Sequence, residues 1–395
     1  MTEAMQPSDL CVETVRRLVG FDTVSSNSNL ALIEWIEAFL ARHGVASRLS
    51  YDPERRKANL FATLGPQGSG GLILAGHTDT VPVTGQVWTS PPFEGVVRDG
   101  KLYGRGAVDM KGFIGTCLAL VPRMARAKLT RPIHLAFTFD EETTMLGART
   151  LVADLREQGI APLACLVGEP TSLKAVIGHK GRRALRCCVR GQSAHSSLPT
   201  HGANAIEYAA KIVARLREMA ERQKSAEERH YGYDVPYSTI VTTRIQGGLS
   251  TNTIPEECAF DFEFRHLPWT DPDQLEAEVR DFARQQVQPQ MEREFGNCAI
   301  RFERESDLPA FGAASSSEGL APGASELLRL IGRRDAPLGY VAFATEASWF
   351  QHAGIPTVVC GPGSIEQAHK PDEYVSLAQL AECELLLAGL VESLQ

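Results

Sequence analysis

The chain has 395 residues, which is long enough for more than one domain, each with its own core. Hydrophobic residues make up 43% of the sequence and charged residues 22%, the balance of an ordinary soluble enzyme. The formal net charge is −8, and this acidic balance argues against a nucleic-acid surface or an anionic membrane as a partner.

Two features of the sequence bear on where the protein works. It contains no uninterrupted apolar run long enough to span a membrane, and its N-terminus lacks the basic-then-apolar order of a secretion signal. Its nine cysteines are odd in number, dispersed and without a CxxC pair. Such thiols fit a reducing cytoplasm, where they act mainly as small core residues. We therefore expect a cytoplasmic protein and exclude the cysteines as metal ligands.

Helices and strands alternate through the first part of the chain. The hydrophobic periods predict helices at 8–20, 30–43, 109–121 and 146–158, and strands at 45–50, 59–64, 71–75, 133–139 and 164–167. Asn29 is the expected cap of the second helix, and Pro122 is expected to end the third. Strands that are buried on both faces and separated by helices indicate a mainly parallel α/β sheet.

The pattern changes at Gly181. Strands at 183–190, 238–245, 258–264 and 298–302 and helices at 203–222 and 273–287 follow the β-α-β-β-α-β order of a ferredoxin-like unit. Because such a unit can fold by itself, we expect residues 181–305 to form a domain inserted into one made of 1–180 and 306–395. Residues 307–323 are predicted to be the return linker. Helices at 324–332, near Trp349 and at 377–394, and a strand at 357–360, then complete the first domain.

Three adjacent acids, Asp140, Glu141 and Glu142, end the predicted strand at 133–139 in the stretch FTFDEETTMLG. Adjacent carboxylates repel one another and lose hydration when they are buried, so folding alone gives no reason to place them at a strand end. A solvated acidic turn is the alternative for an isolated run of this kind. A metal cation facing the acids reverses the argument, provided that the chain supplies other ligands that reach the same place.

Four other segments carry an acid or an imidazole near a strand exit or a glycine turn. His77 and Asp79 lie in GHTDTVP, Asp109 in GRGAVDMKG, Glu169 in VGEPT, and His369 in GPGSIEQAHKPDEY. Taken singly, each has a structural alternative, namely a hydrogen-bonded turn, a helix N-cap, a turn acid or a surface histidine. Open α/β sheets place their sites at the carboxyl ends of the strands, so we expect these side chains to converge.

The combined set of side chains suits metal ions. Two histidines and three carboxylates are suitable ligands for dications such as zinc, cobalt or manganese, with one carboxylate shared between two ions. Paired ions of this kind bind and deprotonate a water and polarise a substrate carbonyl. The residues therefore predict a site for two divalent cations that activates water.

These motifs resemble those of the di-metal aminoacylase and carboxypeptidase family. GHTDTVP, GRGAVDMKG, DEE and GEPT occur in the family's order, and the likeness covers nearly the whole chain. The resemblance implies a zinc-peptidase-like α/β catalytic domain with an inserted ferredoxin-like domain that serves as lid and dimer interface. It also implies one metal held by His77, Asp109 and Glu169, and a second held by Asp109, Glu142 and His369, with Asp109 bridging. The family typically carries zinc in both positions, often replaceable by cobalt.

The same resemblance makes Glu141 the general base and Asp79 the partner that orients His77. The chemistry agrees, because a glutamate beside a ligand that points elsewhere is free to take a proton from the water and deliver it to the leaving amine. We therefore expect hydrolysis of a linear amide bond. A binding protein that keeps the fold without turnover is the alternative class, but such a chain would usually have lost the base or a ligand, and all are present here.

Within the family, residues 345–374 resemble the acetylornithine deacetylases, as do 178–181 and 192–207. The succinyl-diaminopimelate desuccinylases usually carry a Gly-Thr-Ser-Asp-Gly type of segment where this chain has 344–347. The resemblance implies removal of the acetyl group from N2-acetyl-L-ornithine, which gives L-ornithine and acetate in arginine biosynthesis. Desuccinylation, deacetylation of acetylcitrulline or another N-acyl amino acid, and dipeptide cleavage are the alternatives.

Further residues are assigned by the resemblance alone. His195 resembles a family histidine that reaches the partner subunit's site and steadies the oxyanion, which implies a homodimer through the inserted domain. Asn252 and Arg265 resemble residues that fix the substrate, and an arginine can hold an α-carboxylate in bidentate fashion. Glu346 is expected to face the ornithine amine, and Gly363 to offer a backbone N–H near the second histidine ligand. The alternatives are a histidine satisfied within its own domain, a structural ion pair and a plain tight turn.

Overall fold

The computed structural model describes residues 5–68, 70–315 and 318–395. The chain divides into two compact units. Unit 1 consists of Met1–Ile177, Leu320–Gly339 and Thr345–Gln395, and unit 2 of Gly178–Gly319 and Tyr340–Ala344. The boundaries expected from the sequence were 181 and 305. The last strand of unit 2 continues to Leu308, and a short segment from Tyr340 also belongs to that unit.

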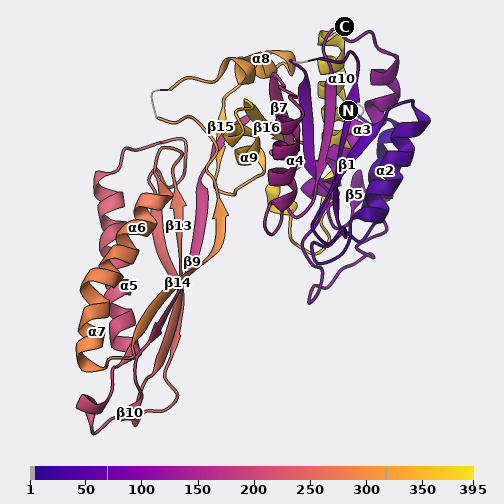
Figure 1. Ribbon diagram of the computed structural model, residues 1–395. Helices are drawn as coiled ribbons and strands as arrows, with labels where there is room; N and C mark the ends of the chain where they lie inside the picture. The colour runs from indigo at the N-terminus through magenta and orange to yellow at the C-terminus, as the bar shows by residue number, and fades with distance from the viewer. Residues whose placement is uncertain (1–4, 69, 316–317) are drawn as a thin grey trace. The chain divides into compact units, whose positions relative to one another are not determined.

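The main sheet of unit 1 has the strand order β1-β2-β6-β3-β7-β16-β8-β15 (Figure 1). Its four central strands, β6, β3, β7 and β16, are parallel, whereas β1, β2 and β8 pair antiparallel beside them. The bounds are β1 Ser47–Tyr51, β2 Ala58–Leu64, β3 Leu72–His77, β6 Ile133–Thr138, β7 Ala164–Pro170, β8 Val176–His179, β15 Gly339–Val341 and β16 Thr357–Gly361. The predicted α/β class with a mainly parallel sheet is confirmed.

Helices cover both faces of this sheet, with α2 and α3 on one side and α4 and α9 on the other (Figure 1). The helices of unit 1 are α1 Asp9–Val19, α2 Leu30–Arg42, α3 Gly112–Arg126, α4 Leu146–Glu157, α8 Pro322–Leu330, α9 Ala347–His352 and α10 Leu377–Ser393. Every residue of β3, β6, β7 and β16 is buried, as expected for strands covered on both faces. The ends of these four strands are therefore held by a packed core. Among the described residues, no helix is both long enough and apolar enough to cross a membrane.

The expectation that Pro122 ends its helix is wrong, because α3 continues to Arg126. A proline inside a helix removes one N–H and crowds the carbonyl four residues earlier, at a cost of about 3 kcal/mol. Val121 and Met124, on either side of Pro122, are buried in the hydrophobic core, and this burial offsets the cost.

Asn29 stands at the cap position of α2, but its side chain forms no cap hydrogen bond. The side-chain amide donates instead to the carbonyl oxygen of Ala58 and to the hydroxyl of Thr78, each at 2.9 Å. Asn29 therefore ties the start of α2 to β2 and to the residue that follows β3.

A small sheet that the sequence did not reveal lies beside the main one in unit 1. Its strands are β4 Val96–Arg98, β5 Lys101–Tyr103 and β17 Tyr374–Ser376, in the order β17-β5-β4. Three residues are too few to show an alternating pattern. This sheet joins the segment before Asp109 to the segment after His369, which matters for the site below.

Unit 2 contains a four-stranded antiparallel sheet in the order β11-β13-β9-β14, with helices on one face (Figure 1). Its elements are β9 Gly181–Arg190, α5 Ala205–Ala226, β11 Thr239–Gly247, β13 Glu257–His266, α6 Pro272–Phe282, α7 Gln288–Glu294 and β14 Ala299–Leu308, with a two-stranded ribbon of β10 Ala194–His195 and β12 Thr253–Ile254. Buried and partly exposed residues alternate along β13, so one face packs on the helices. The β-α-β-β-α-β order predicted from the sequence is confirmed. Two residues of the predicted return linker, 316 and 317, lie outside the described residues.

The Gly168→Ala substitution tests the packing behind the strand ends. A Cβ atom at Gly168 would lie 1.9 Å from the ring of Phe113, which is fully buried in α3. We expect the variant to lose about 1–3 kcal/mol of the free energy of unfolding, measured by chemical denaturation. Gly389→Ala in α10 is the matched control, because no atom lies within 4 Å of its added methyl. This control is expected to be neutral or slightly stabilising, and equal stability of the two variants would contradict the prediction.

Candidate metal centre

The predicted ligands lie at one edge of the main sheet. His77 is the last residue of β3, Glu141 and Glu142 follow β6, and Glu169 lies near the end of β7. These three strands are neighbours and parallel, so their carboxyl ends meet at the same edge. His369 follows β16, the next parallel strand. The strand order therefore explains why residues far apart in the sequence converge.

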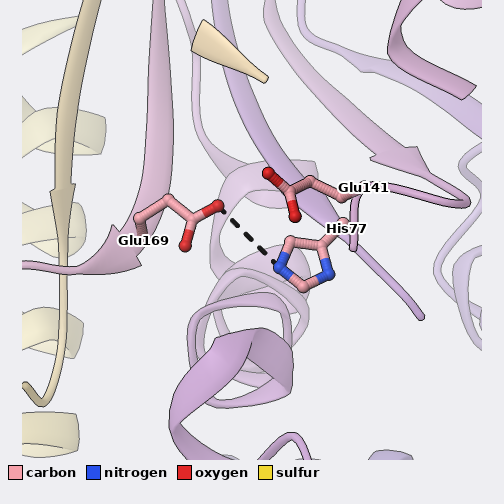
Figure 2. Close-up of side chains that lie close together, drawn as sticks. All are labelled: His77, Glu141 and Glu169. Carbon is pink, nitrogen blue, oxygen red and sulfur yellow. Dashed lines mark ion pairs between the residues drawn. The ribbon is translucent and has the colours of Figure 1, made fainter. Parts of the chain in front are cut away.

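Two overlapping groups of side chains are close enough to hold a metal ion. In the first, ligand atoms of His77, Glu141 and Glu169 all lie within 4.8 Å of one another, and Figure 2 shows these three side chains converging from three segments. The Nε2 atom of His77 lies 3.8 Å from Oε1 of Glu169, the pair joined by the dashed line. The second group consists of His77, Asp109 and Glu142.

Asp109 occupies the centre of the cluster. It lies in the segment Ala107–Lys111, directly before α3, where the backbone of Asp109 and Met110 is not helical. Its Oδ1 atom is 3.0 Å from Nε2 of His77, and its Oδ2 atom is 3.3 Å from Nε2 of His369. The same His369 atom lies 3.1 Å from the carboxylate of Glu142. The two oxygens of Asp109 thus face two different imidazoles, as a carboxylate shared between two ions would.

Burial and crowding set the proton affinities of the cluster. Burial, together with the neighbouring carboxylates, raises the pKa values of Glu141, Glu142 and Glu169 above those of ordinary glutamates. Burial also opposes the ionisation of Asp109, but hydrogen bonds with the two histidines outweigh it and hold the pKa of Asp109 well below its usual range. Hydrogen bonds to Asp109 and Glu142 raise the pKa of His369 to about 10.

The donor set fits divalent cations. Four carboxylates, from Asp109, Glu141, Glu142 and Glu169, gather around two imidazoles, and burial removes most of the water that would otherwise screen their repulsion. Nitrogen and oxygen donors of this kind suit zinc and related ions. A bound cation offsets the repulsion among these carboxylates, and their negative charge then stabilises the bound ion.

Asp79 holds the turn that carries two of the acids. Its Oδ1 accepts a hydrogen bond from the backbone N–H of Glu141 at 3.0 Å, and its Oδ2 accepts one from the N–H of Glu142 at 3.2 Å. The hydroxyl of Ser25 donates to the same Oδ2 at 2.7 Å. For the Nδ1 atom of His77, the nearer oxygen is the backbone carbonyl of Asp79, at 3.1 Å, with the carboxylate at 3.6 Å. The expected contact between Asp79 and His77 is therefore mainly through the backbone.

The first of the three adjacent acids turns away from the cluster. Asp140 has a left-handed backbone, with φ of 59°, and forms an ion pair with Lys57. Lys57 also donates to the carbonyl oxygen of Ser25. The sequence analysis assigned Glu141 and Glu142 by resemblance and gave Asp140 no role, and the backbone reversal that turns Asp140 toward Lys57 leaves no periodic signal. Ser25 and Lys57 were not singled out either, because they lie outside the motifs that carry the acids and imidazoles.

The two remaining candidates in unit 1 are both engaged by protein groups. Glu346 is fully buried, and its Oε2 accepts a hydrogen bond from the hydroxyl of Thr138 at 2.6 Å. Its Oε1 has no hydrogen-bond partner among the described residues, and burial raises the pKa of Glu346 to about 7. The N–H of Gly363 donates to the side chain of Gln379 at 3.2 Å, in a turn where Gly363 has φ of 81°. That contact is the one expected of a structural turn.

Three candidates lie in unit 2. His195, on β10, is exposed, with Nδ1 2.7 Å from the hydroxyl of Ser197. The side-chain oxygen of Asn252 accepts a hydrogen bond from the hydroxyl of Ser250 at 2.9 Å. Arg265 forms an ion pair with Glu263 on its own strand, Nε to Oε1 at 2.9 Å, which is the structural alternative noted above.

The sequence matches the model of a known peptidase family and is similar to acetylornithine deacetylases. The model of peptidase family M20/M25/M40 matches residues 73–393. The acetylornithine deacetylase of Pasteurella multocida (strain Pm70) is 35% identical over 383 residues, covering 95% of each chain.

Two solved structures share the fold across nearly the whole chain. Aminopeptidase PepT from Bacillus cereus has a TM-score of 0.73 at 19% identity and covers 99% of each chain. A dinuclear metal-binding peptidase of the M20 family from Bacillus subtilis has a TM-score of 0.64 at 16% identity and covers 98% of each chain.

Metal binding is expected to release protons. In the metal-free protein the raised pKa values of the three glutamates and of His369 favour protonated forms, whereas a ligand must be deprotonated. Affinity for Zn²⁺ should therefore fall as the pH is lowered, because protons compete with the ion. Titration calorimetry of the metal-free protein in buffers of different ionisation enthalpy measures the release. An affinity that does not change between pH 8 and pH 6 would contradict the prediction.

Proposed function

This chain belongs to peptidase family M20/M25/M40 and is a hydrolase of amide bonds, and we propose that it removes the acetyl group from N2-acetyl-L-ornithine to give L-ornithine and acetate. The observation that carries the proposal is the identity of about a third of the residues with acetylornithine deacetylases over nearly the full length. The cluster of acids and imidazoles at the sheet edge supports the reaction class.

We propose that the cluster holds two divalent ions. His77, Asp109 and Glu169 would hold one, and Asp109, Glu142 and His369 the other. The position of Asp109 between two imidazoles supports a shared carboxylate. The Bacillus subtilis relative is described as a dinuclear metal-binding peptidase. Zinc is the proposed ion, and cobalt and manganese suit the same donors. When bound, such ions activate water and polarise a carbonyl.

Glu141 is the proposed general base and acid. It is only partly buried, its backbone is held by Asp79, and no described group donates a hydrogen bond to its carboxylate. Burial raises the pKa of Glu141, which gives it a higher proton affinity than an ordinary glutamate, as proton transfer requires. Glu141 takes a proton from the attacking water, whose oxygen forms a bond to the acetyl carbon. As the C–N bond breaks, Glu141 delivers that proton to the departing amine of ornithine, and acetate is left.

The roles assigned to the remaining residues are also proposals. His195, Asn252 and Arg265 would contact the substrate or its oxyanion, with Arg265 exchanging Glu263 for the α-carboxylate. Glu346 would face the side-chain amine, a role supported by its unpartnered Oε1. Gly363 would act through the turn that it forms rather than through its N–H, which Gln379 already accepts.

We propose a cytoplasmic homodimer that forms through unit 2. The edge strand β11 leaves Val241 and Ile245 about half exposed, at 50% and 52%, and a second copy pairing along this edge would cover them. The nine cysteines are free thiols, and all except Cys188 are buried, which supports a reducing compartment.

The substrate assignment is tested with a panel of amides. N2-acetyl-L-ornithine, N-acetyl-L-citrulline, N-succinyl-diaminopimelate and a dipeptide are incubated with protein that has been stripped of metal and with protein reloaded with Zn²⁺ or Co²⁺. We expect the highest kcat/KM for N2-acetyl-L-ornithine and loss of turnover after chelation. A preference for the succinyl substrate would overturn the substrate assignment. If the protein reloaded with metal hydrolyses none of these amides, the proposal that it is an N-acyl amino acid hydrolase would be overturned.

Glu141→Gln separates proton transfer from metal binding. The amide cannot take up the proton, so kcat should fall by about 10²–10⁴-fold, while elemental analysis still finds two ions. Asp140→Asn is the matched control, since this neighbouring acid faces Lys57 rather than the cluster. We expect a much smaller change in kcat for the control. A Glu141→Gln variant that keeps its activity would remove Glu141 from the mechanism.

A further inference from the structure

The backbone of His369 adopts an uncommon conformation. Its φ is 63°, in the left-handed region that residues with a side chain seldom occupy. Its side chain is 51% exposed, in contrast to the nearly buried carboxylates of Asp109 and Glu142 that its Nε2 faces. Hydrogen bonds from neighbouring segments therefore help to hold this exposed histidine in place.

Residues 86–104 supply several of those contacts to the segment 369–373. The side-chain amide of Gln86 donates to the carbonyl oxygen of His369 at 3.0 Å. Three residues further on, a carboxylate oxygen of Asp372 accepts hydrogen bonds from the backbone and the hydroxyl of Thr89, each at 2.9 Å. The N–H of Gly104 donates to the carbonyl oxygen of Glu373 at 2.9 Å. The backbone of the segment is thus anchored at both ends.

A buried ion pair lies beneath this segment. Arg105 and Glu373 are each 1% exposed, and Nη1 of Arg105 donates to Oε2 of Glu373 at 2.5 Å. The other oxygen of Glu373 accepts the backbone N–H groups of Val108 and Asp109, at 3.0 and 3.2 Å. Glu373 therefore connects Arg105 to the peptide group of the central carboxylate.

The guanidinium of Arg105 also connects to His369. Its Nη2 donates to Oε1 of Gln86 at 2.7 Å, and Gln86 in turn donates to the His369 carbonyl. The indole N–H of Trp88 donates to the same Gln86 oxygen at 3.2 Å, and Arg105 lies over the Trp88 ring, 5.1 Å from its centroid. The guanidinium of Arg105 thus starts two branches of hydrogen bonds. One runs through Glu373 to the backbone of Asp109, and the other runs through Gln86 to the backbone carbonyl of His369.

We propose that Arg105 is a positioning residue that fixes the backbones of Asp109 and His369 relative to one another, and so shapes the site of the ion that these two residues share. The inference rests on the proposed pair of metal ions. Two donors of one rigid guanidinium reach both branches, which the single ammonium of a lysine does not reproduce. Contacts of this kind outside the ligand set alter metal affinity by about 10–100-fold.

Gln86→Glu tests the branch to His369. The carboxylate still accepts from Arg105 and Trp88 but has no hydrogen to donate to the His369 carbonyl. We expect Co²⁺ titration of the metal-free protein to show one ion weakened by about tenfold or more and the other unchanged. The absorption band of that one ion should shift, and the melting temperature of the metal-free protein should stay the same. An added negative charge would by itself strengthen cation binding, so a weaker ion points to the lost hydrogen bond.

Arg105→Lys tests the guanidinium from which both branches start. Gln158 is an exposed residue at the end of α4, and Gln158→Glu is the matched control for the added charge. Arg105→Lys should weaken the same ion as Gln86→Glu and, because Asp109 is the proposed ligand of both ions, the other ion to a smaller extent, whereas Gln158→Glu should weaken neither. Equal weakening of both ions together with a lower melting temperature would indicate a merely structural ion pair and overturn the inference. Unchanged binding of both ions by both variants would also overturn it. Wild-type protein that binds fewer than two Co²⁺ ions would overturn the proposed metal pair, and this inference with it.

Discussion

The structure depends on one constraint, the repulsion among four carboxylates that the fold brings to one edge of its main sheet. Two imidazoles offset part of this charge, and Asp109 is stabilised as an anion between them. The imidazoles compensate the glutamates less: His369 contacts Glu142, yet burial and the neighbouring carboxylates still raise the proton affinity of Glu141, Glu142 and Glu169. A protein selected only for stability would not keep such a cluster, because apolar residues of similar volume would cost less. The cluster is accounted for when cations are part of the native state.

Two separate sets of hydrogen bonds hold the cluster in this geometry. On one side, the carboxylate of Asp79, itself held by the hydroxyl of Ser25, accepts the backbone N–H groups of Glu141 and Glu142. On the other, Glu373 binds the backbone of Asp109. In both cases a carboxylate accepts backbone N–H groups, so the ligand side chains themselves stay free for an ion. Backbone anchoring of this kind fixes positions without competing for the ligand atoms.

The parts of the site that were predictable from sequence are those encoded locally. His77 and Glu169 each follow or end a wholly apolar strand, and the parallel order of such strands brings their ends together. Glu373 was not predictable, because its partner Arg105 lies 268 positions away and neither belongs to a periodic element. The continuation of α3 past Pro122 was missed because tertiary burial, not local propensity, decides it.

The neighbouring glutamates Glu141 and Glu142 lie on one turn, yet their similar side chains have different neighbours in the cluster. Glu142 faces His369 at 3.1 Å, beside Asp109, whereas Glu141 lies with His77 and Glu169. Both backbones are fixed by the same carboxylate of Asp79, so the separation of the two side chains is set by the turn rather than by chance rotamers. A positive ion lowers the pKa of the acids that bind it more than that of an unbound neighbour. The acid that stays unbound therefore keeps the higher proton affinity, which is the property that a general base and acid needs.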